Sequence, residues 1–113
     1  MTAEIALMNK EAIALAADSA VTMTTGSIPK IFPSANKIFT LSKYHPVGIM
    51  IYGAASFMGV PWETIIKIYR RKLCRTSFLR LEDYAKDFMD FIDNENSLFP
   101  ESMQESFLRE WLA

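Results

Sequence analysis

Three residues of this sequence have side chains and positions suited to nucleophilic catalysis: Thr2, Asp18 and Lys37. The apolar run 13–17 has the composition of a strand that is buried on both faces, and Asp18 follows it directly. A carboxylate at that place has little water to solvate it, so it needs a cation nearby or its pKa rises. Lys37 is the best candidate for that cation. If Met1 is removed, Thr2 carries a hydroxyl group and an α-amine on one residue, and the three residues form a nucleophile assembly.

The first strands of the chain would position Asp18. Residues 3–8 alternate loosely between apolar and polar and predict a first strand, and the polar residues 9–11 predict a hairpin turn. Residues 13–17 then return as the second strand. Residues 22–36 hold Gly26, Pro29 and Pro33 among hydroxyl residues, which predicts a loop that can include an edge strand.

Two further strands would position Lys37. Residues 37–41 predict a third strand, 42–46 a turn, and the almost wholly apolar run 47–55 a fourth strand. His45 lies in the turn before Pro46, where a solvated loop histidine is the expected interpretation.

Helices are expected after residue 60. Pro61 suits the first turn of the first helix, and Glu63 favours its N-terminal end. A second helix is expected from about Leu81, and a third follows a break at 94–100. Apolar residues at helical spacing predict the buried faces of the first two helices: Trp62, Ile65, Ile66, Tyr69 and Leu73, then Tyr84, Phe88, Phe91 and Ile92. Met103, Phe107, Leu108 and Trp111 indicate the third helix.

Charged residues are distributed unevenly along these helices. Basic side chains cluster on and just after the first helix: Lys67, Arg70, Arg71, Lys72 and Arg75. This cluster has two interpretations, a solvated helix face or a docking surface for a partner. Nine of the thirteen acidic residues lie from Glu82 onward and could face the basic helix, although exposed pairs stabilise little. No role is expected for Cys74.

Composition restricts the class of protein. Half of the 113 residues are hydrophobic and 22% are charged, which predicts the packed core of one domain, or of part of one. The net charge of −1 argues against a nucleic-acid partner. One cysteine excludes an internal disulfide, and neither a signal peptide nor a membrane-spanning run is evident. We therefore expect a soluble cytoplasmic protein with no membrane partner. No metal-ligand spacing or Gly-rich phosphate loop appears, so no metal or cofactor is expected.

The order of these elements resembles the N-terminal half of proteasome β subunits and of the related bacterial ring peptidase, which are N-terminal-nucleophile hydrolases. In that family a terminal threonine precedes a catalytic acidic residue by sixteen positions, as Thr2 precedes Asp18 here. The sequences Ala17-Asp18-Ser19 and Lys37-Ile38-Phe39 match the family's patterns at the second and third strands, and Gly53 matches the glycine that ends its fourth strand. The resemblance covers roughly residues 2 to 90.

The resemblance implies a role for each matching residue. The Thr2 hydroxyl would be the nucleophile, with its own amine as the base, since an α-amino group has a pKa of roughly 7.7–8.0. Lys37, held by Asp18, would place positive charge beside Thr2. The Gly53 amide would donate to the oxyanion, and a glycine there allows the substrate to approach closely.

The resemblance also implies a peptide substrate. An extended peptide would add as a strand between Thr22 and residues 53–55. The pocket for the residue before the cut would be lined by apolar side chains, namely Val21, Ala35, Phe39, Ile51 and Ala55. This lining predicts a preference for hydrophobic substrates.

The expected fold is α+β, an antiparallel sheet with helices on one face, forming about half of an αββα sandwich. Residues 2–55 would supply strands and loops, and 60–113 helices, in a single and incomplete proteasome-like domain. The rest would come from a longer chain or from copies in a homo-oligomer, with an unfoldase as a further partner. The alternative is a non-catalytic assembly module, in which Asp18 and Lys37 form a structural pair and Thr2 merely begins a strand.

Overall fold

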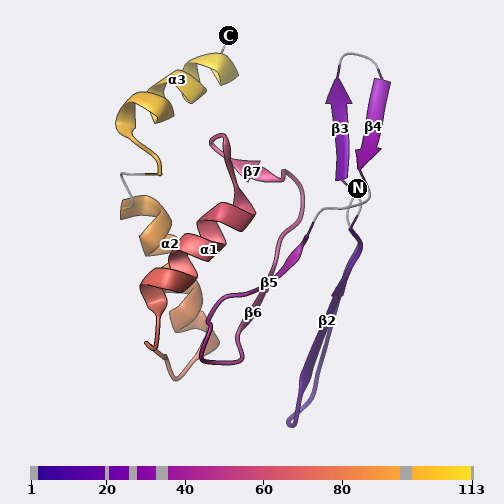
Figure 1. The fold of residues 1–113 in the computed structure, drawn as a ribbon, viewed down its shortest axis with the longest axis vertical. Coiled ribbons are helices and arrows are strands. Elements are labelled where there is room, and N and C mark those ends of the chain that lie inside the picture. The colour runs from indigo at the N-terminus through magenta and orange to yellow at the C-terminus, as the bar shows by residue number, and fades with distance from the viewer. Residues whose placement is uncertain (1–2, 20, 26–27, 33–35, 95–97, 113) are drawn as a thin grey trace.

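The computed structural model of the protein describes residues 3–19, 21–25, 28–32, 36–94 and 98–112. These residues form a small α+β fold with three helices and short antiparallel sheets. The helices lie on one side of the molecule and the first two hairpins on the other, with β5 and β6 between them (Figure 1).

The first hairpin is the one that the sequence predicts. Strand β1 (Glu4–Met8) pairs antiparallel with β2 (Ile13–Ala17). The connecting turn is closed by Asn9, whose side-chain Oδ1 accepts hydrogen bonds from the backbone N–H groups of Glu11 and Ala12, both at 2.8 Å. An Asn side chain that replaces backbone acceptors in this way favours a tight turn.

The segment expected to be a loop contains a second hairpin. Strand β3 (Val21–Thr25) pairs antiparallel with β4 (Ile28–Phe32), so the interpretation of 22–36 as mainly loop was wrong. Threonine and branched apolar residues favour strands, and two residues between two such runs are typical of a hairpin. Pro29 is compatible with β4 because a two-stranded sheet has only edge strands.

The third hairpin is shorter than expected. Strand β5 (Ile38–Thr40) pairs with β6 (Gly48–Met50), and the backbone N–H of Ile51 donates to the Lys37 carbonyl oxygen at 2.9 Å. The predicted strand 47–55 therefore ends early. Gly53 has φ +77°, a left-handed conformation that interrupts an extended strand.

A fourth hairpin precedes the helices and was not predicted. Strand β7 (Ser56–Phe57) pairs with β8 (Val60–Pro61). Its two turn residues, Met58 and Gly59, have φ of 51° and 82°, as a two-residue hairpin turn with left-handed conformations requires.

The three predicted helices are confirmed: α1 (Trp62–Leu73), α2 (Leu81–Asn94) and α3 (Glu101–Leu112). Pro61 lies just before α1 rather than within its first turn. The predicted inward positions of α1 and α2 are also confirmed, because the buried residues are Ile65, Ile66, Tyr69 and Leu73 of α1 and Tyr84, Phe88 and Phe91 of α2. The side chain of Trp111 lies outside the described part of the chain.

The hydrophobic core lies between the helices and one face of the third hairpin. Its buried members are Leu41, Ile65, Ile66, Tyr69, Leu73, Tyr84, Phe88, Phe91 and Phe99. Alternate residues of the third hairpin pack against this core, namely Phe39, Val47, Ile49 and Ile51. The Tyr69 and Phe88 rings meet edge to face, with centroids 5.0 Å apart.

The helices do not cover the first hairpin. Residues 13–17 were expected to be buried on both faces, but one face of β1–β2 is bare: Ile5 pairs with Ala16, Leu7 pairs with Ala14, and all four are exposed. Leu15, on the opposite face, is partly buried and lies against Gly48 of β6. The expectation of one continuous sheet was therefore wrong for the described residues, which form four separate two-stranded sheets.

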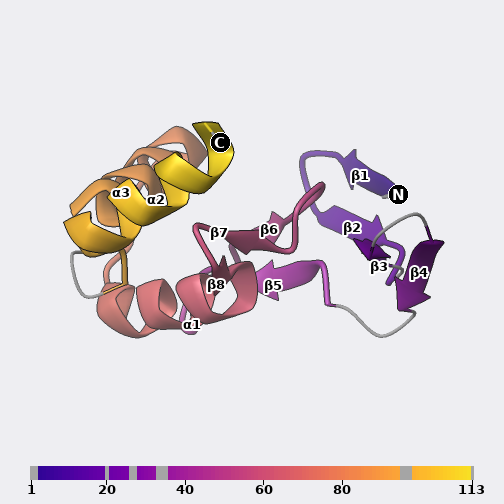
Figure 2. The same ribbon diagram turned by 90° about the horizontal axis from the view of Figure 1, so that it is seen from above.

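The molecule is elongated as a result (Figure 2). Its radius of gyration is 16.1 Å, against about 13 Å for a compact chain of this length. Its accessible surface is 8810 Å², against about 6,300 Å² for a compact monomer of this mass. The additional surface is consistent with the exposed apolar side chains of the first hairpin.

Candidate functional site

The Asp18–Lys37 pair predicted from the sequence is present. Asp18 directly follows β2 and Lys37 directly precedes β5. The Lys37 Nζ donates a hydrogen bond to Asp18 Oδ1 at 2.6 Å. The Lys37 side chain is buried, at 6% exposed, whereas that of Asp18, which was expected to have little water around it, is 35% exposed. The lysine is therefore the group that depends on its partner, since burial penalises an ammonium that lacks counter-charge.

The backbone of Ala3 meets the same carboxylate. The Asp18 backbone N–H donates to the Ala3 carbonyl oxygen at 3.0 Å, and the Ala3 N–H donates to Asp18 Oδ1 at 3.3 Å. The residue that follows Thr2 in the sequence is thus held at the Asp18–Lys37 pair. Thr2 itself lies outside the described residues.

These contacts determine the charge state of Asp18. The hydrogen bond from Lys37 lowers the pKa of Asp18 below its ordinary value of 3.8, and the bond from the Ala3 backbone lowers it further. Asp18 is therefore a carboxylate across the neutral range.

Gly53 comes two residues after the backbone bond between Ile51 and Lys37. It is exposed, and a Cβ added to it would meet no atom within 4 Å. Its left-handed φ is sufficient reason for a glycine at this position. The open space beside it is also what an approaching ligand backbone would need.

The residues expected to contact a substrate fall into three groups. Phe39 and Ile51 are partly buried and pack against the hydrophobic core. Ala55 is exposed, and its carbonyl oxygen accepts from the Trp62 N–H at 3.1 Å. The remaining residues are Val21 and Thr22, of which only the strand backbone is described, and Ala35, which lies outside the described residues.

A shallow cavity of about 270 Å³ lies beside the pair. It is lined by Ala3, Glu4, Ile5, Ala16, Ala17 and Asp18. Glu4 is a residue that the sequence analysis did not single out, and its Oε1 is buried without a hydrogen-bond partner among the described residues. In the sequence, the only feature that marks Glu4 is that it places a carboxylate in an otherwise apolar strand.

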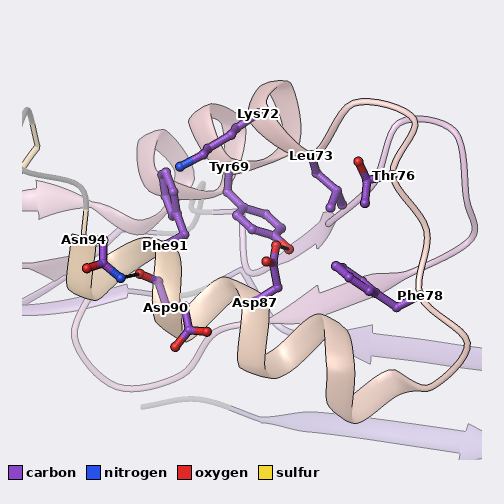
Figure 3. A pocket seen from close by; sticks show the side chains of 9 residues that line it. All are labelled: Tyr69, Lys72, Leu73, Thr76, Phe78, Asp87, Asp90, Phe91 and Asn94. Atoms are coloured by element: carbon purple, nitrogen blue, oxygen red, sulfur yellow. Dashed lines mark hydrogen bonds between the residues drawn. The ribbon is translucent and has the colours of Figure 1, made fainter.

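A larger cavity, of about 320 Å³, lies between α1 and α2 (Figure 3). The Tyr69 hydroxyl donates to Asp87 Oδ2 at 2.8 Å, and the Asn94 side chain donates to the Asp90 carbonyl oxygen at 2.8 Å. Burial, followed by this bond to Asp87, raises the pKa of Tyr69 well above its ordinary range. These polar groups are satisfied by one another, so the cavity has the character of helix packing rather than of a reactive site.

Two further kinds of site were sought in the described part of the chain. No group of three or more His, Cys, Asp or Glu side chains gathers there in a way that would hold a metal ion. Among the same residues, no helix has both the length and the apolar character needed to span a membrane.

Comparisons with protein-family models, with curated proteins and with solved structures found no match to this chain.

Proposed function

We propose that this chain is part of a threonine peptidase or amidohydrolase of the proteasome-like, N-terminal-nucleophile class. The observation that carries the proposal is the 2.6 Å contact between Lys37 and Asp18, with Ala3 hydrogen-bonded to the same carboxylate. Thr2 directly precedes Ala3 in the sequence, and the proposal requires its hydroxyl and amine to come close to the Lys37 ammonium. Positive charge beside Thr2 would lower the pKa of its hydroxyl and favour the free amine as its base.

The assignment of the fold as half of an αββα sandwich is part of this proposal. The bare apolar face of β1–β2 supports half of an αββα sandwich, because such a face is normally covered by a second layer. The cover would come from more of the same chain or from other subunits. Peptide substrates, a homo-oligomer, an unfoldase partner and a cytoplasmic location follow from the family resemblance and are part of the same proposal.

Labelling with a peptide epoxyketone tests the proposal, because this reagent reacts with both the hydroxyl and the amine of an amino-terminal threonine. Intact-mass measurement first establishes that Met1 has been removed, since a retained Met1 blocks the amine. We expect one adduct, located on Thr2 by peptide mapping. Thr2→Ala should abolish it, and Thr64→Ala, which changes an exposed threonine on α1, should leave it unchanged. Labelling or hydrolysis retained in a folded Thr2→Ala protein would exclude the threonine nucleophile.

The second candidate function is a non-catalytic assembly module with the same fold. The large exposed apolar surface of the first hairpin favours it, because single soluble chains rarely leave such patches bare. In this case the ion pair between Lys37 and Asp18 has a structural role only and joins the first hairpin to β5. A protein that has lost Met1 and still resists the epoxyketone would support this function over catalysis.

A further inference from the structure

A separate cavity, of about 310 Å³, lies on the outer side of α1 where the turn 42–46 meets the helix. It is lined by Lys43, Tyr44, Lys67, Arg70, Arg71 and Cys74. Its size falls within the roughly 300–1,000 Å³ that is typical of small-molecule sites. None of its lining residues belongs to the candidate catalytic assembly.

The lining of this cavity is strongly cationic. Four of its six residues are lysine or arginine, and none is acidic. Lys67, Arg70 and Arg71 share one face of α1 because they are three and four positions apart. Lys67 pairs with Glu63 at 3.1 Å, whereas Lys43, Arg70 and Arg71 form no ion pair with any carboxylate in the described part of the chain. Like charges converging on one hollow repel each other unless an anion lies between them.

Contacts outside the cavity hold its walls in place. Arg70 Nη1 donates to the Thr40 carbonyl oxygen at 3.1 Å and to its Oγ1 at 2.7 Å, which anchors one edge of the guanidinium. The Arg75 guanidinium lies over the Tyr44 ring at 5.0 Å, and His45 Nε2 donates to the Arg75 carbonyl oxygen at 3.2 Å. The turn is thereby fixed to the end of α1, and one edge of the Arg70 guanidinium is held in place before a ligand arrives.

The turn has its own internal support. Ser42, which is buried, accepts hydrogen bonds at its Oγ from the backbone N–H groups of Tyr44 and His45, at 3.2 and 3.1 Å. This arrangement sets the direction in which Lys43 and Tyr44 leave the turn.

We propose that this cavity binds a small free polyanion of the pyrophosphate class, including the phosphate chain of a nucleotide. Guanidinium groups bind phosphate oxygens through paired hydrogen bonds, and lysines add point charges. A concave site of this volume suits a compact ligand with several charges. A nucleic-acid backbone would need an extended basic track, which a chain of net charge −1 does not suggest.

Cys74 provides the readout, because it lines the cavity, is exposed and is the only cysteine of the chain. The test measures the rate at which iodoacetamide alkylates Cys74, with and without pyrophosphate, at ionic strength matched with sodium chloride. We expect pyrophosphate to slow alkylation several-fold and saturably. Arg71→Glu should abolish this protection. Lys86→Glu makes the same charge change at an exposed position of α2 and should retain it. Circular dichroism checks that both variants are folded.

Two results of this test would overturn the proposal. One is an alkylation rate that pyrophosphate leaves unchanged relative to sodium chloride at the same ionic strength. The other is stronger protection by a single-stranded oligonucleotide than by pyrophosphate at equal phosphate concentration, which would assign the cavity to nucleic acid. A charged reagent gives an independent check: iodoacetate should react faster, relative to iodoacetamide, in the wild type than in Arg71→Glu. Equal ratios in the two proteins would show that the cavity does not attract small anions.

Discussion

Lys37 Nζ lies 2.6 Å from Asp18 Oδ1, although nineteen positions separate the two residues in the chain. This contact joins the end of the β1–β2 hairpin to the start of β5, and therefore joins the exposed part of the molecule to the part that packs on the helices. A structural role and a catalytic role both require the pair. Stability measurements and chemical labelling separate the two roles.

Asp18→Asn should lower stability at neutral pH and weaken the acid dependence of unfolding. Lys37 lowers the pKa of Asp18 in the folded state, so the folded carboxylate binds protons less tightly than the unfolded one. The stabilisation is present above the unfolded pKa of about 3.9 and is lost as the pH falls through the lower folded value. Denaturant midpoints of wild type and variant should differ near neutral pH and converge in strong acid. Glu11→Gln, an exposed charge loss in the same hairpin, is the control, and a difference that does not vary with pH would contradict the assignment.

Tyr69→Phe should lower the free energy of unfolding by about 1.5–3 kcal/mol, because it removes a hydrogen bond to a charged acceptor, Asp87. Burial and this bond raise the pKa of Tyr69, so the folded state keeps the phenol protonated. The resulting stabilisation is complete below the unfolded pKa of about 10 and declines as the pH rises above it. Urea unfolding at neutral and alkaline pH measures both effects. Tyr52→Phe, at an exposed tyrosine, should change neither, and a Tyr69→Phe protein as stable as wild type would show that the bond contributes nothing.

Gly53→Ala and Gly59→Ala form a matched pair for the proposed oxyanion site. Both glycines have φ near +80° and open space around the missing Cβ, so alanine should cost each about 1–2 kcal/mol of backbone strain. Only at Gly53 would the added methyl group meet an approaching substrate. Epoxyketone labelling of Thr2 should therefore slow in Gly53→Ala and continue normally in Gly59→Ala. Equal labelling of the two variants would remove Gly53 from the site.

The helices and the first hairpin could be predicted because their patterns are local. Ile65, Ile66, Tyr69 and Leu73 recur at helical spacing, and their burial on α1 follows from that spacing alone. The Asp18–Lys37 contact was also predictable, since a carboxylate after an apolar strand and a lysine before another strand need each other. The partial exposure of Asp18 depends on packing between elements, which the sequence pattern does not contain.

The sequence did not predict the β3–β4 hairpin, the early end of the strand at 47–55 or the exposed face of β1–β2. The β3–β4 hairpin was obscured because Gly26 and two prolines indicate a loop, whereas the threonines between them favour strands. The run 47–55 is apolar enough for a strand, but Gly53 adopts a left-handed φ and the chain turns there. The exposure of β1–β2 could not be predicted, because an apolar run indicates burial but does not show which other element would cover it.

Substrate preference is testable if the complete protein proves active. The pocket implied by the family resemblance would be lined by Val21, Ala35, Phe39, Ile51 and Ala55, which are all apolar. Burying Leu or Phe in such a pocket gains roughly 1.5–3 kcal/mol, while an unpaired charge loses several. A fluorogenic peptide panel should therefore show fastest turnover with a hydrophobic residue before the cut. If arginine substrates are cleaved fastest, the pocket is lined by other residues.

The bare face of the first hairpin should cause the isolated chain to self-associate. Ile5, Leu7, Ala14 and Ala16 lie on one exposed face of β1–β2, and Leu7 alone is 63% exposed. Covering such a face removes apolar surface from water, so association is favoured at rising protein concentration. Sedimentation velocity should detect oligomers of the wild type, and Leu7→Lys should shift them toward monomer because burying its ammonium is unfavourable.

Leu79→Lys is the matched control for that experiment, because Leu79 is 99% exposed and lies in the connection between α1 and α2, away from the hairpin. It makes the same chemical change and should leave the oligomers intact. Dissociation by both variants would indicate a general effect of added charge rather than an interface on β1–β2. A wild-type chain that sediments as a monomer and unfolds in a single cooperative step would show that this apolar face needs no cover, and would count against the half-sandwich fold.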